Sequence, residues 1–343
     1  MDSETSILVI YTGGTIGMIL DKNTGALVPF NFSEIYSQFP ALSLMDYKID
    51  NYCFDPVIDS SDIYPDVWVE LVKVIESNYE KYDGFVVLHG TDTMSYTASA
   101  LSFMLENLNK PVIFTGSQLP LGMVRTDGRE NFITAVEIAA AKEDETPVVP
   151  EVCIYFENRL FRGNRTYKFN AEHFEAFKSV NYPPLAEAGV YIKYNYGNIH
   201  KPNFKALKAH KNYDNNIAIL KLFPGITEGQ VRATLGLNGL RAVVLETYGS
   251  GNAPSAGWFI NAISEAINKG MVVLNVTQCN GGSVDMGKYI TGKRLADTGV
   301  LSGYDMTTEA AVTKLMFLAG RYKHNSDVAR YLQTSISGEM TVK

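Results

Sequence analysis

Short apolar runs alternate with stretches of helical periodicity over the first 141 residues of the chain. The apolar runs, which predict buried strands, cover residues 7–11, 85–88 and 111–115. The stretches that predict helices follow Pro65 and then cover residues 94–105 and 131–141. Strands that alternate with helices indicate right-handed crossovers and a mainly parallel sheet covered on both faces.

The pattern weakens after residue 193 and then starts again. Residues 194–215 are polar and contain Pro202, several lysines and several asparagines, which is typical of a linker. Beyond it, strands are predicted over residues 217–223, 241–245 and 271–276, and helices over 227–235, 257–269, 308–319 and 327–334. We therefore expect an N-terminal catalytic α/β domain (1–193), a linker (194–215) and a smaller C-terminal parallel α/β domain (216–343).

Composition narrows the class of protein. The 343 residues are 46% hydrophobic, and 30 Lys and Arg against 37 Asp and Glu give a net charge of −7. The length is enough for two packed cores. The excess of acidic over basic residues gives no indication of a basic surface that would bind nucleic acid. Three dispersed cysteines and five histidines suggest neither disulfides nor a metal site. The N-terminus resembles no secretion signal and no apolar stretch is long enough for a membrane, so we expect a cytoplasmic protein.

Three short polar motifs each follow a predicted strand of the first domain. They are Thr12-Gly13-Gly14-Thr15, Gly90-Thr91-Asp92-Thr93 and Thr115-Gly116-Ser117-Gln118. The loops at the carboxyl ends of parallel strands converge where ligands bind, so distant residues are expected to meet in one pocket. Taken singly, the Gly-Gly pair is equally explained by a tight turn. A helix cap is an alternative but less favoured explanation of Thr91 to Thr93, because three polar side chains gather at one strand end. The dinucleotide fingerprint G-x-G-x-x-G is absent, and His89 is interpreted as a core or turn residue rather than a base.

The order and spacing of these motifs resemble the bacterial-type L-asparaginases, in particular their cytoplasmic type I branch. The resemblance covers nearly the whole chain. It continues through Asp59-Ser60-Ser61-Asp62, Arg162-Gly163-Asn164-Arg165-Thr166, Gly251-Asn252-Ala253-Pro254, Asn275-Val276-Thr277-Gln278-Cys279 and Asp305-Met306-Thr307. It implies the two-domain asparaginase fold and hydrolysis of L-asparagine to L-aspartate and ammonia without a metal or organic cofactor.

The resemblance also implies roles for four residues of the first domain. Thr15 is the nucleophile that becomes acylated, and Thr91, Asp92 and Lys168 form a second cluster beside it. A threonine hydroxyl needs a nearby base, and a lysine can serve if poor solvation lowers its pKa toward the working pH. Asp92 then either orients Lys168 or binds the amino group of the substrate. How the two threonines share the work stays open at this stage.

We expect the site to bind both the α-carboxylate and the α-amino group of the substrate. The resemblance assigns this role to Asp59, Ser60, Ser61, Thr91, Asp92 and Ser117. Family members form homodimers and tetramers in which the second domain completes the site of a neighbour. Asn252 is the candidate for that contribution, and Asp285 a weaker one.

Two departures from the family pattern are visible. Many relatives have a flap tyrosine where this chain has Leu27, and Tyr304 is a hypothetical substitute. Some type I enzymes also bind a second asparagine at a regulatory site through an arginine, whose position is Glu246 here, although Cys279 of that site is present. Tyr167 replaces a smaller residue nearby. An acidic side chain repels the carboxylate of asparagine, so we expect this regulatory site to be lost or altered.

Two other functions remain open from the sequence. One is the amidase subunit of a tRNA-dependent amidotransferase, which normally carries an extra N-terminal barrel; the first predicted strand begins within ten residues of Met1, which leaves no room for one. The other is a non-catalytic amino-acid sensor. Retention of Thr15, Thr91, Asp92 and Lys168 argues against a sensor, because binding alone needs neither a nucleophile nor a base.

Overall fold

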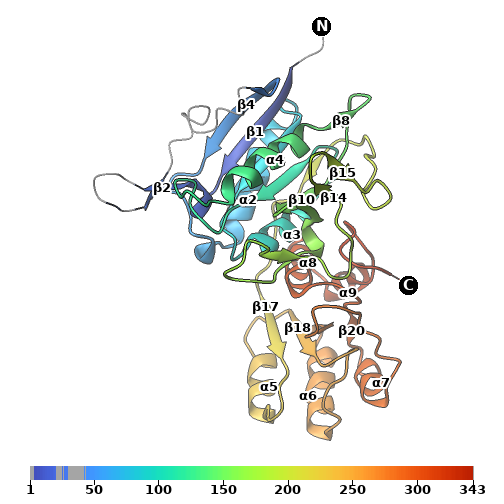
Figure 1. The fold of residues 1–343 in the computed structure, drawn as a ribbon. Helices are drawn as coiled ribbons and strands as arrows, with labels where there is room; N and C mark the ends of the chain where they lie inside the picture. The colour runs from blue at the N-terminus through green and yellow to red at the C-terminus, as the bar shows by residue number, and fades with distance from the viewer. Residues whose placement is uncertain (1–3, 21–24, 26, 30–41, 43, 343) are drawn as a thin grey trace. The chain divides into compact units, whose positions relative to one another are not determined.

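The computed structural model describes residues 4–20, 25, 27–29, 42 and 44–342, and the chain folds into two compact units. The first unit is Met1–Lys211 and the second is Asn212–Lys343 (Figure 1). The stretch 194–215, expected to be a linker, is attached to the first unit over much of its length. Its strand β16 (Lys208–Ala209) pairs with β6 (Leu105–Glu106), and the side-chain oxygen of Asn109 accepts from the backbone N–H groups of Asn203 and Phe204.

The first unit is built on an eight-stranded sheet in the order β15-β14-β11-β10-β7-β5-β1-β4. Its parallel strands are β4 (Tyr47–Cys53), β1 (Thr5–Tyr11), β5 (Gly84–Leu88), β7 (Val112–Thr115) and β10 (Val152–Phe156). The strands β11 (Arg159–Arg162), β14 (Ala186–Ala188) and β15 (Ile192–Tyr194) continue it as antiparallel hairpins. The predicted mainly parallel sheet is therefore present, with an antiparallel extension that the apolar pattern did not predict.

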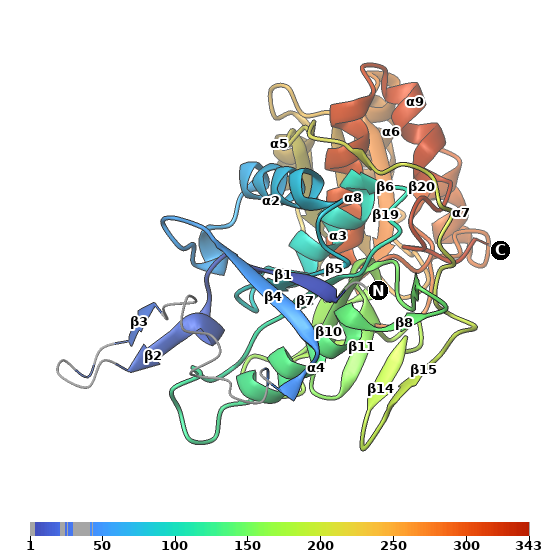
Figure 2. The ribbon, with the colours of Figure 1, turned by 90° about the horizontal axis from the view of Figure 1, so that it is seen from above.

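Helices cover both faces of this sheet. Helix α4 (Gly128–Ala140) packs Phe132, Ala135 and Val136 against Val9 and Val86 on one face. Helices α2 (Pro65–Asn78) and α3 (Met94–Met104) lie on the other, as the view along the sheet shows (Figure 2). Strands β1 and β5 are buried on both faces, which explains why they read as unbroken apolar runs.

Short elements complete the first unit. They are the 3-10 helices η1 (Thr15–Gly17), η4 (Ser60–Asp62) and η5 (Gly163–Arg165) and the paired strands β2 (Met18–Leu20), β3 (Leu27–Pro29), β8 (Lys142–Glu143), β9 (Thr146–Pro147), β12 (Tyr167–Lys168) and β13 (Phe177–Lys178). Both η1 and η4 begin directly after strand-end loops, so they carry polar residues to the carboxyl edge of the sheet.

The second unit has a four-stranded parallel sheet in the order β17-β18-β19-β20. Its elements are β17 (Ile217–Lys221), α5 (Glu228–Leu235), β18 (Ala242–Thr247), α6 (Gly257–Asn268), β19 (Val272–Thr277), α7 (Ile290–Ala296), β20 (Leu301–Ser302), α8 (Thr308–Arg321) and α9 (Asn325–Leu332). One core cluster joins Val231, Phe259 and Ile263 of α5 and α6 to Val243 and Val273 of the sheet. Helix α8 contacts β17, β18 and β19. The smaller parallel α/β domain predicted from the sequence is thus observed.

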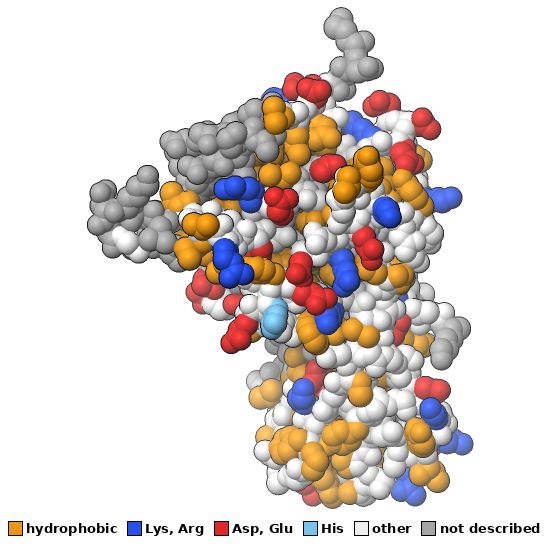
Figure 3. Space-filling model, viewed as in Figure 1, with side chains coloured by type: hydrophobic (Ala, Val, Ile, Leu, Met, Phe, Trp, Pro, Cys, Tyr) orange, Lys and Arg blue, Asp and Glu red, His pale blue; other side chains and the backbone are white. Residues whose placement is uncertain are grey.

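Acidic and basic side chains are interspersed over the face of the molecule shown in Figure 3. The charge on this face is therefore mixed in sign. Every helix in the described ranges lacks the combination of length and apolar character that a membrane crossing requires.

A fully buried ion pair ties the C-terminal segment to the second unit. Lys314 of α8 and Glu339 are both 0% exposed, and Lys314 Nζ lies 2.6 Å from Glu339 Oε1. Lys314 also donates to the carbonyl oxygens of Leu332 and Thr334, while Glu339 accepts from the backbone N–H groups of Ile336 and Ser337. The Lys314 ammonium and the Glu339 carboxylate neutralise each other, so removal of either side chain leaves the other charge buried and unpaired.

We expect Lys314→Met to lower the free energy of unfolding by about 3–5 kcal/mol, because it leaves the Glu339 carboxylate buried without its cationic partner. Urea denaturation followed by circular dichroism measures the change. The control is Lys73→Met, which removes an exposed lysine that pairs with Glu70 at 3.4 Å. That exposed pair is screened by water and its loss should leave the denaturation midpoint where it was. Equal midpoints for the two variants would contradict the expectation.

Candidate active site

The candidate site lies at the point in the first sheet where the strand order reverses. Strand β1 has β4 on one side and β5 on the other, and the chain continues from β5 to β7, away from β1. The loops after β1 and β5 therefore leave in opposite directions at the carboxyl ends of these strands, which is where open α/β sheets form their ligand crevice. Thr15 follows β1 and Thr91 follows β5, so the two threonines singled out from the sequence lie on the loops at this point of the sheet.

Glycines allow the two loops to approach each other at backbone distance. A Cβ atom on Gly14 would lie 2.5 Å from both the Cα and the N of Gly90, and a Cβ on Gly13 would lie 2.1 Å from the carbonyl oxygen of Ile58. Gly14 also has φ +90°, in the region that favours glycine. The glycines of the first motif are therefore required by close packing as well as by the turn.

Thr15 begins η1 and is half-buried. Among the described residues its hydroxyl has no hydrogen-bond partner, in contrast to the nearby Thr12, whose hydroxyl donates to Leu88 O. The backbone N–H groups of Thr91 and Asp92 likewise donate to no acceptor in the described part of the chain. Unengaged donors at a strand end are suited to bind an external oxygen.

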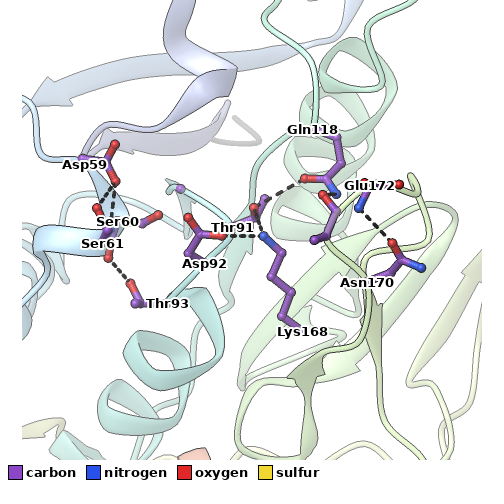
Figure 4. Close-up of polar contacts among 12 residues, drawn as sticks. Asp59, Ser60, Ser61, Thr91, Asp92, Thr93, Gln118, Lys168, Asn170 and Glu172 are labelled. Atoms are coloured by element: carbon purple, nitrogen blue, oxygen red, sulfur yellow. Dashed lines mark hydrogen bonds and ion pairs between the residues drawn. The ribbon is translucent and has the colours of Figure 1, made fainter.

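The loop before α2 contributes further polar residues, Asp59 to Ser61, to the candidate site. Asp59 caps η4, and its Oδ1 accepts from both the N–H and the hydroxyl of Ser61 at 2.8 Å. Ser60 is buried against Gly90, and its carbonyl accepts from the Thr93 hydroxyl at 2.6 Å. These bonds hold the Asp59 to Ser61 loop against the Thr91 to Thr93 loop, as Figure 4 shows.

Lys168 joins Thr91 and Asp92 in one cluster (Figure 4). Its Nζ donates to Thr91 Oγ1 at 2.8 Å and to Asp92 Oδ1 at 2.6 Å. The lysine side chain is 18% exposed and the aspartate side chain 63% exposed. The ammonium is thus largely withdrawn from water, while the carboxylate has free oxygen surface for a ligand.

Lys168 reaches this cluster because a buried segment carries it there. Arg162, at the end of β11, is 3% exposed and forms a bidentate pair with Glu151 at 2.6 and 3.0 Å. The Thr166 hydroxyl donates to Arg162 O, and Gly163 packs against Ala98 of α3. This packing fixes η5 beside the helix that follows Thr93, so β12 presents Lys168 to its N-terminal end.

Ser117 and Gln118 close the site on the β7 side. Ser117 is 3% exposed and its hydroxyl donates to Leu119 O at 2.6 Å. Gln118 Oε1 lies 3.5 Å from Thr91 Oγ1. Gln118 belongs to the third strand-end motif, but its place in the site was not predicted, because no spacing rule connects it to Thr91 or Lys168.

The other candidates lie at the carboxyl edge of the second sheet. Asn252 forms a bridge with Tyr248 after β18, and its Oδ1 accepts from Thr291 at 2.9 Å. Asp285 donates its N–H to Ser250 O, and the carbonyl oxygen of Tyr304 accepts from Val284 N. The loops that carry Asn252, Asp285 and Tyr304 are therefore linked within the second unit. Tyr304 has φ +51°, an uncommon conformation for a residue other than glycine.

Comparison with known proteins places this chain in a family. The family model described as "Asparaginase, N-terminal" matches residues 6–200, and the one described as "Glutaminase/Asparaginase C-terminal domain" matches residues 216–332. The chain belongs to the asparaginase family. Its two matched regions fall within the two observed units.

Relatives of this chain differ in the activity that their names state. The chain is 42% identical to L-asparaginase 1 of Escherichia coli over 98% of both chains. It is 40% identical to the human 60 kDa lysophospholipase, over 98% of this chain and 62% of that protein. It is 33% identical to a subunit of the glutamyl-tRNA(Gln) amidotransferase of Methanobrevibacter smithii, over 99% of this chain and 78% of that one. Membership in the asparaginase family therefore leaves the specific substrate to be argued from the site.

The fold agrees with that of a solved asparaginase. The crystal structure of L-asparaginase I from Vibrio cholerae superposes with a TM-score of 0.90 at 42% sequence identity, covering 99% of this chain and 100% of that one. The two-domain asparaginase fold expected from the sequence is confirmed.

The departures from the family pattern have defined places in the structure. Leu27 begins β3, and its side chain lies outside the described residues. Glu246, near the end of β18, accepts from the Thr308 hydroxyl at 2.6 Å and lies 3.4 Å from Lys221 Nζ. Its carboxylate is thus held by groups of its own unit. Cys279 is exposed, and Tyr167 lies in β12 beside Lys168.

His89 is a core residue of the asparaginase fold here, in agreement with its interpretation from the sequence. Its Nδ1 lies 2.6 Å from Gly90 O, which is only an acceptor, so Nδ1 carries the proton. Its Nε2 then accepts from Thr97 Oγ1 at 3.0 Å, and Thr97 accepts from Trp68 Nε1. Burial lowers the pKa of His89 from 6.5 to about 4 and outweighs the opposing bond to Gly90.

We predict that His89 stays neutral down to a pH near 4, whereas in the unfolded chain it protonates near pH 6.5. The unfolded state then binds more protons between these values, so stability should fall as the pH drops from 6.5 toward 4. NMR titration of ring-labelled histidines measures the midpoint of His89. A midpoint for His89 near 6.5 would show that the ring is not held neutral by burial.

Proposed function

We propose that the protein is an L-asparaginase that hydrolyses L-asparagine to L-aspartate and ammonia through an ester on Thr15. The observation that carries this proposal is the cluster of Lys168, Thr91 and Asp92 beside the loop of Thr15. Lys168 Nζ contacts both Thr91 Oγ1 and Asp92 Oδ1, and the Gly14 to Gly90 contact brings the Thr15 loop against the Thr91 loop. Membership in the asparaginase family gives the same reaction class.

In the first stage, Thr15 Oγ1 attacks the side-chain carbonyl carbon of asparagine. The hydroxyl proton passes to a base and then to the amide nitrogen, the C–N bond breaks, and ammonia leaves an aspartyl ester on Thr15. We assign Lys168 in its neutral form as the base of this step, because its Nζ lies 2.8 Å from Thr91 Oγ1 in the cluster. The N–H groups of Thr91 and Asp92 support an assignment as donors to the developing oxyanion.

In the second stage, water attacks the ester carbonyl and the C–O bond to Thr15 breaks. The water gives one proton to the Thr91 and Lys168 side, and Thr15 regains its hydroxyl proton as L-aspartate leaves. The reaction is thereby balanced without an external co-reactant. We assign Thr91 to this step because its oxygen accepts a hydrogen bond from Lys168 Nζ at 2.8 Å.

Substrate selection is assigned to the polar groups around the crevice. Asp92 and Asp59 are exposed carboxylates that suit the α-amino group, and we assign Ser60, Ser61 and Ser117 to the α-carboxylate. The Ser61 and Ser117 hydroxyls, which donate to Asp59 and to Leu119 O here, would exchange those acceptors for the substrate. We further propose that a homo-oligomer, a dimer or tetramer in the cytoplasm, completes each site. In it, a neighbouring copy supplies Asn252 and, less centrally, Asp285.

Purified protein should release ammonia from L-asparagine, and Thr15→Ala should lower kcat on the order of 10³-fold or more because it removes the acylated oxygen. Ammonia release is measured with L-asparagine, L-glutamine and D-asparagine, and fatty-acid release with a lysophospholipid. Thr146→Ala is the matched control, since Thr146 lies in the β8 to β9 hairpin. Turnover of another substrate in preference to L-asparagine, or full activity of Thr15→Ala, would reject the proposal.

The rate should depend hyperbolically on the L-asparagine concentration. The position expected to hold a regulatory arginine is Glu246, and its carboxylate is engaged by Thr308 and Lys221. A negative charge there repels the carboxylate of a second asparagine. Steady-state rates over a wide concentration range test this, and a clearly sigmoidal curve would mean that a regulatory site survives.

A further inference from the structure

Gln118 contacts the catalytic cluster and the segment that follows Lys168 at the same time. Its Nε2 donates to the backbone carbonyl oxygens of Ala171 at 3.2 Å and of His173 at 3.0 Å. Its Oε1 lies 3.5 Å from Thr91 Oγ1, a long hydrogen bond. In Figure 4 its side chain extends beside Thr91 on the side away from Asp59.

The chemistry of these contacts fixes the orientation of the amide. Carbonyl oxygens only accept, so the Gln118 NH₂ must face Ala171 and His173, and Oε1 must face Thr91. Oε1 also only accepts, which directs the Thr91 hydroxyl hydrogen toward Gln118. The lone pairs of Thr91 Oγ1 are then left for Lys168 Nζ, which donates to them at 2.8 Å.

The turn held by Gln118 is itself ordered by local bonds. Asn170 Oδ1 accepts from the N–H groups of Glu172 at 2.8 Å and of His173 at 3.0 Å. This Asx turn points the carbonyl groups of the segment at Gln118. Because the turn begins two residues after Lys168, a movement of the turn displaces the lysine relative to Thr91.

The backbone of Gln118 is anchored from helix α4. Gln118 N donates to both carboxylate oxygens of Asp127, at 3.1 and 3.0 Å, and Leu119 N donates to Oδ1 at 3.1 Å. Asn131, 4% exposed, donates to Asp127 Oδ2 and to Gly116 O and accepts from Glu157 N. The base of the Gln118 side chain is thus fixed by a network that does not involve Lys168.

We propose that Gln118 is a positioning residue that sets the geometry between Thr91 and Lys168 by clamping the 170–173 turn and orienting the Thr91 hydroxyl. This inference rests on the proposed function, in which Thr91 and Lys168 move protons. A misplacement of about 1 Å between such groups costs on the order of 10²-fold in rate. Gln118 therefore controls proton transfer by Lys168 without touching the substrate in this role.

The test compares Gln118→Met and Gln118→Glu with Asn109→Leu. Met is close in size to Gln and removes both amide contacts, whereas Glu places a carboxylate near Lys168. Asn109 is a matched control, because its Nδ2 also donates to two backbone carbonyls, those of Asn107 and Lys205. It precedes β7 and so lies at the end of that strand opposite to Gln118.

Gln118→Met should lower kcat for L-asparagine about 10-fold to 100-fold and change KM less than about threefold. Gln118→Glu should shift the ascending limb of the pH–rate profile to higher pH, since a nearby anion stabilises the Lys168 ammonium. Asn109→Leu should lower the melting temperature and leave kcat and the pH profile unchanged. NMR titration of 13Cε-labelled lysine, assigned with Lys168→Arg, should show the same upward shift of the Lys168 midpoint in Gln118→Glu.

Wild-type kcat in Gln118→Met would overturn the inference. So would a loss of kcat that only follows the loss of melting temperature, with the pH profile and the Lys168 midpoint unmoved in Gln118→Glu. Failure of the wild type to release ammonia would reject the asparaginase proposal instead. The lysine titration would still decide the role of Gln118, because it needs no turnover. If Gln118→Met does not fold, Gln118→Glu supplies both readouts.

Discussion

The backbone contact between Gly14 and Gly90 is the constraint on which the candidate site depends. Strands β1 and β5 are parallel neighbours, but their loops leave in opposite directions, so nothing in the sheet itself keeps the loops together beyond the strand ends. A Cβ on Gly14 would lie 2.5 Å from Gly90 Cα, so any other residue would force the loops apart. The contact therefore holds the loop that carries Thr15 against the loop that carries Thr91.

Lys168 reaches the same crevice by a different route. It follows the antiparallel extension of the sheet, and the buried Arg162–Glu151 pair and the packing of Gly163 on Ala98 fix its approach. Burying two charges is costly unless geometry and hydrogen bonds are nearly ideal, which the bidentate contact and the bond from Arg162 to Asn198 O provide. The site thus combines two loops placed by parallel strands with a lysine placed by a buried ion pair.

The polar groups of the site divide into those that are satisfied and those that are available. His89, Ser60 and Thr12 are buried and bonded within the protein, so they support the loops. Thr15 Oγ1 and the N–H groups of Thr91 and Asp92 have no partner among the described residues. Such a division is expected of a preorganised site, in which fixed donors and a nucleophile await a ligand while the surrounding network is already complete.

Sequence periodicity was sufficient for the architecture. The fully apolar runs at β1, β5, β7 and β18 are buried on both sides and stand out from their neighbours, so the parallel α/β character of both units was predictable. The strands β11, β14 and β15 were not predicted, because they are short and their mixed burial gives no clear period. Strand β10 was also missed, although all five of its residues are buried. The strand-end motifs likewise pointed to Thr15, Thr91 and Asp92, since their polar residues follow buried strands, whereas Asp59 and Lys168 were named only through the family resemblance.

Only the tertiary structure decided which of these residues meet. The position of Lys168 beside Thr91 and Asp92 depends on long-range packing of η5 on α3, which no local pattern encodes. Gln118 is a similar case, because its significance rests on carbonyl groups some fifty residues away in the sequence. The sequence by itself therefore determined the elements and the chemical types available at their ends, through local periodicity and turn chemistry. The contacts that join those groups were decided by side-chain packing and hydrogen bonding between segments that are distant along the chain.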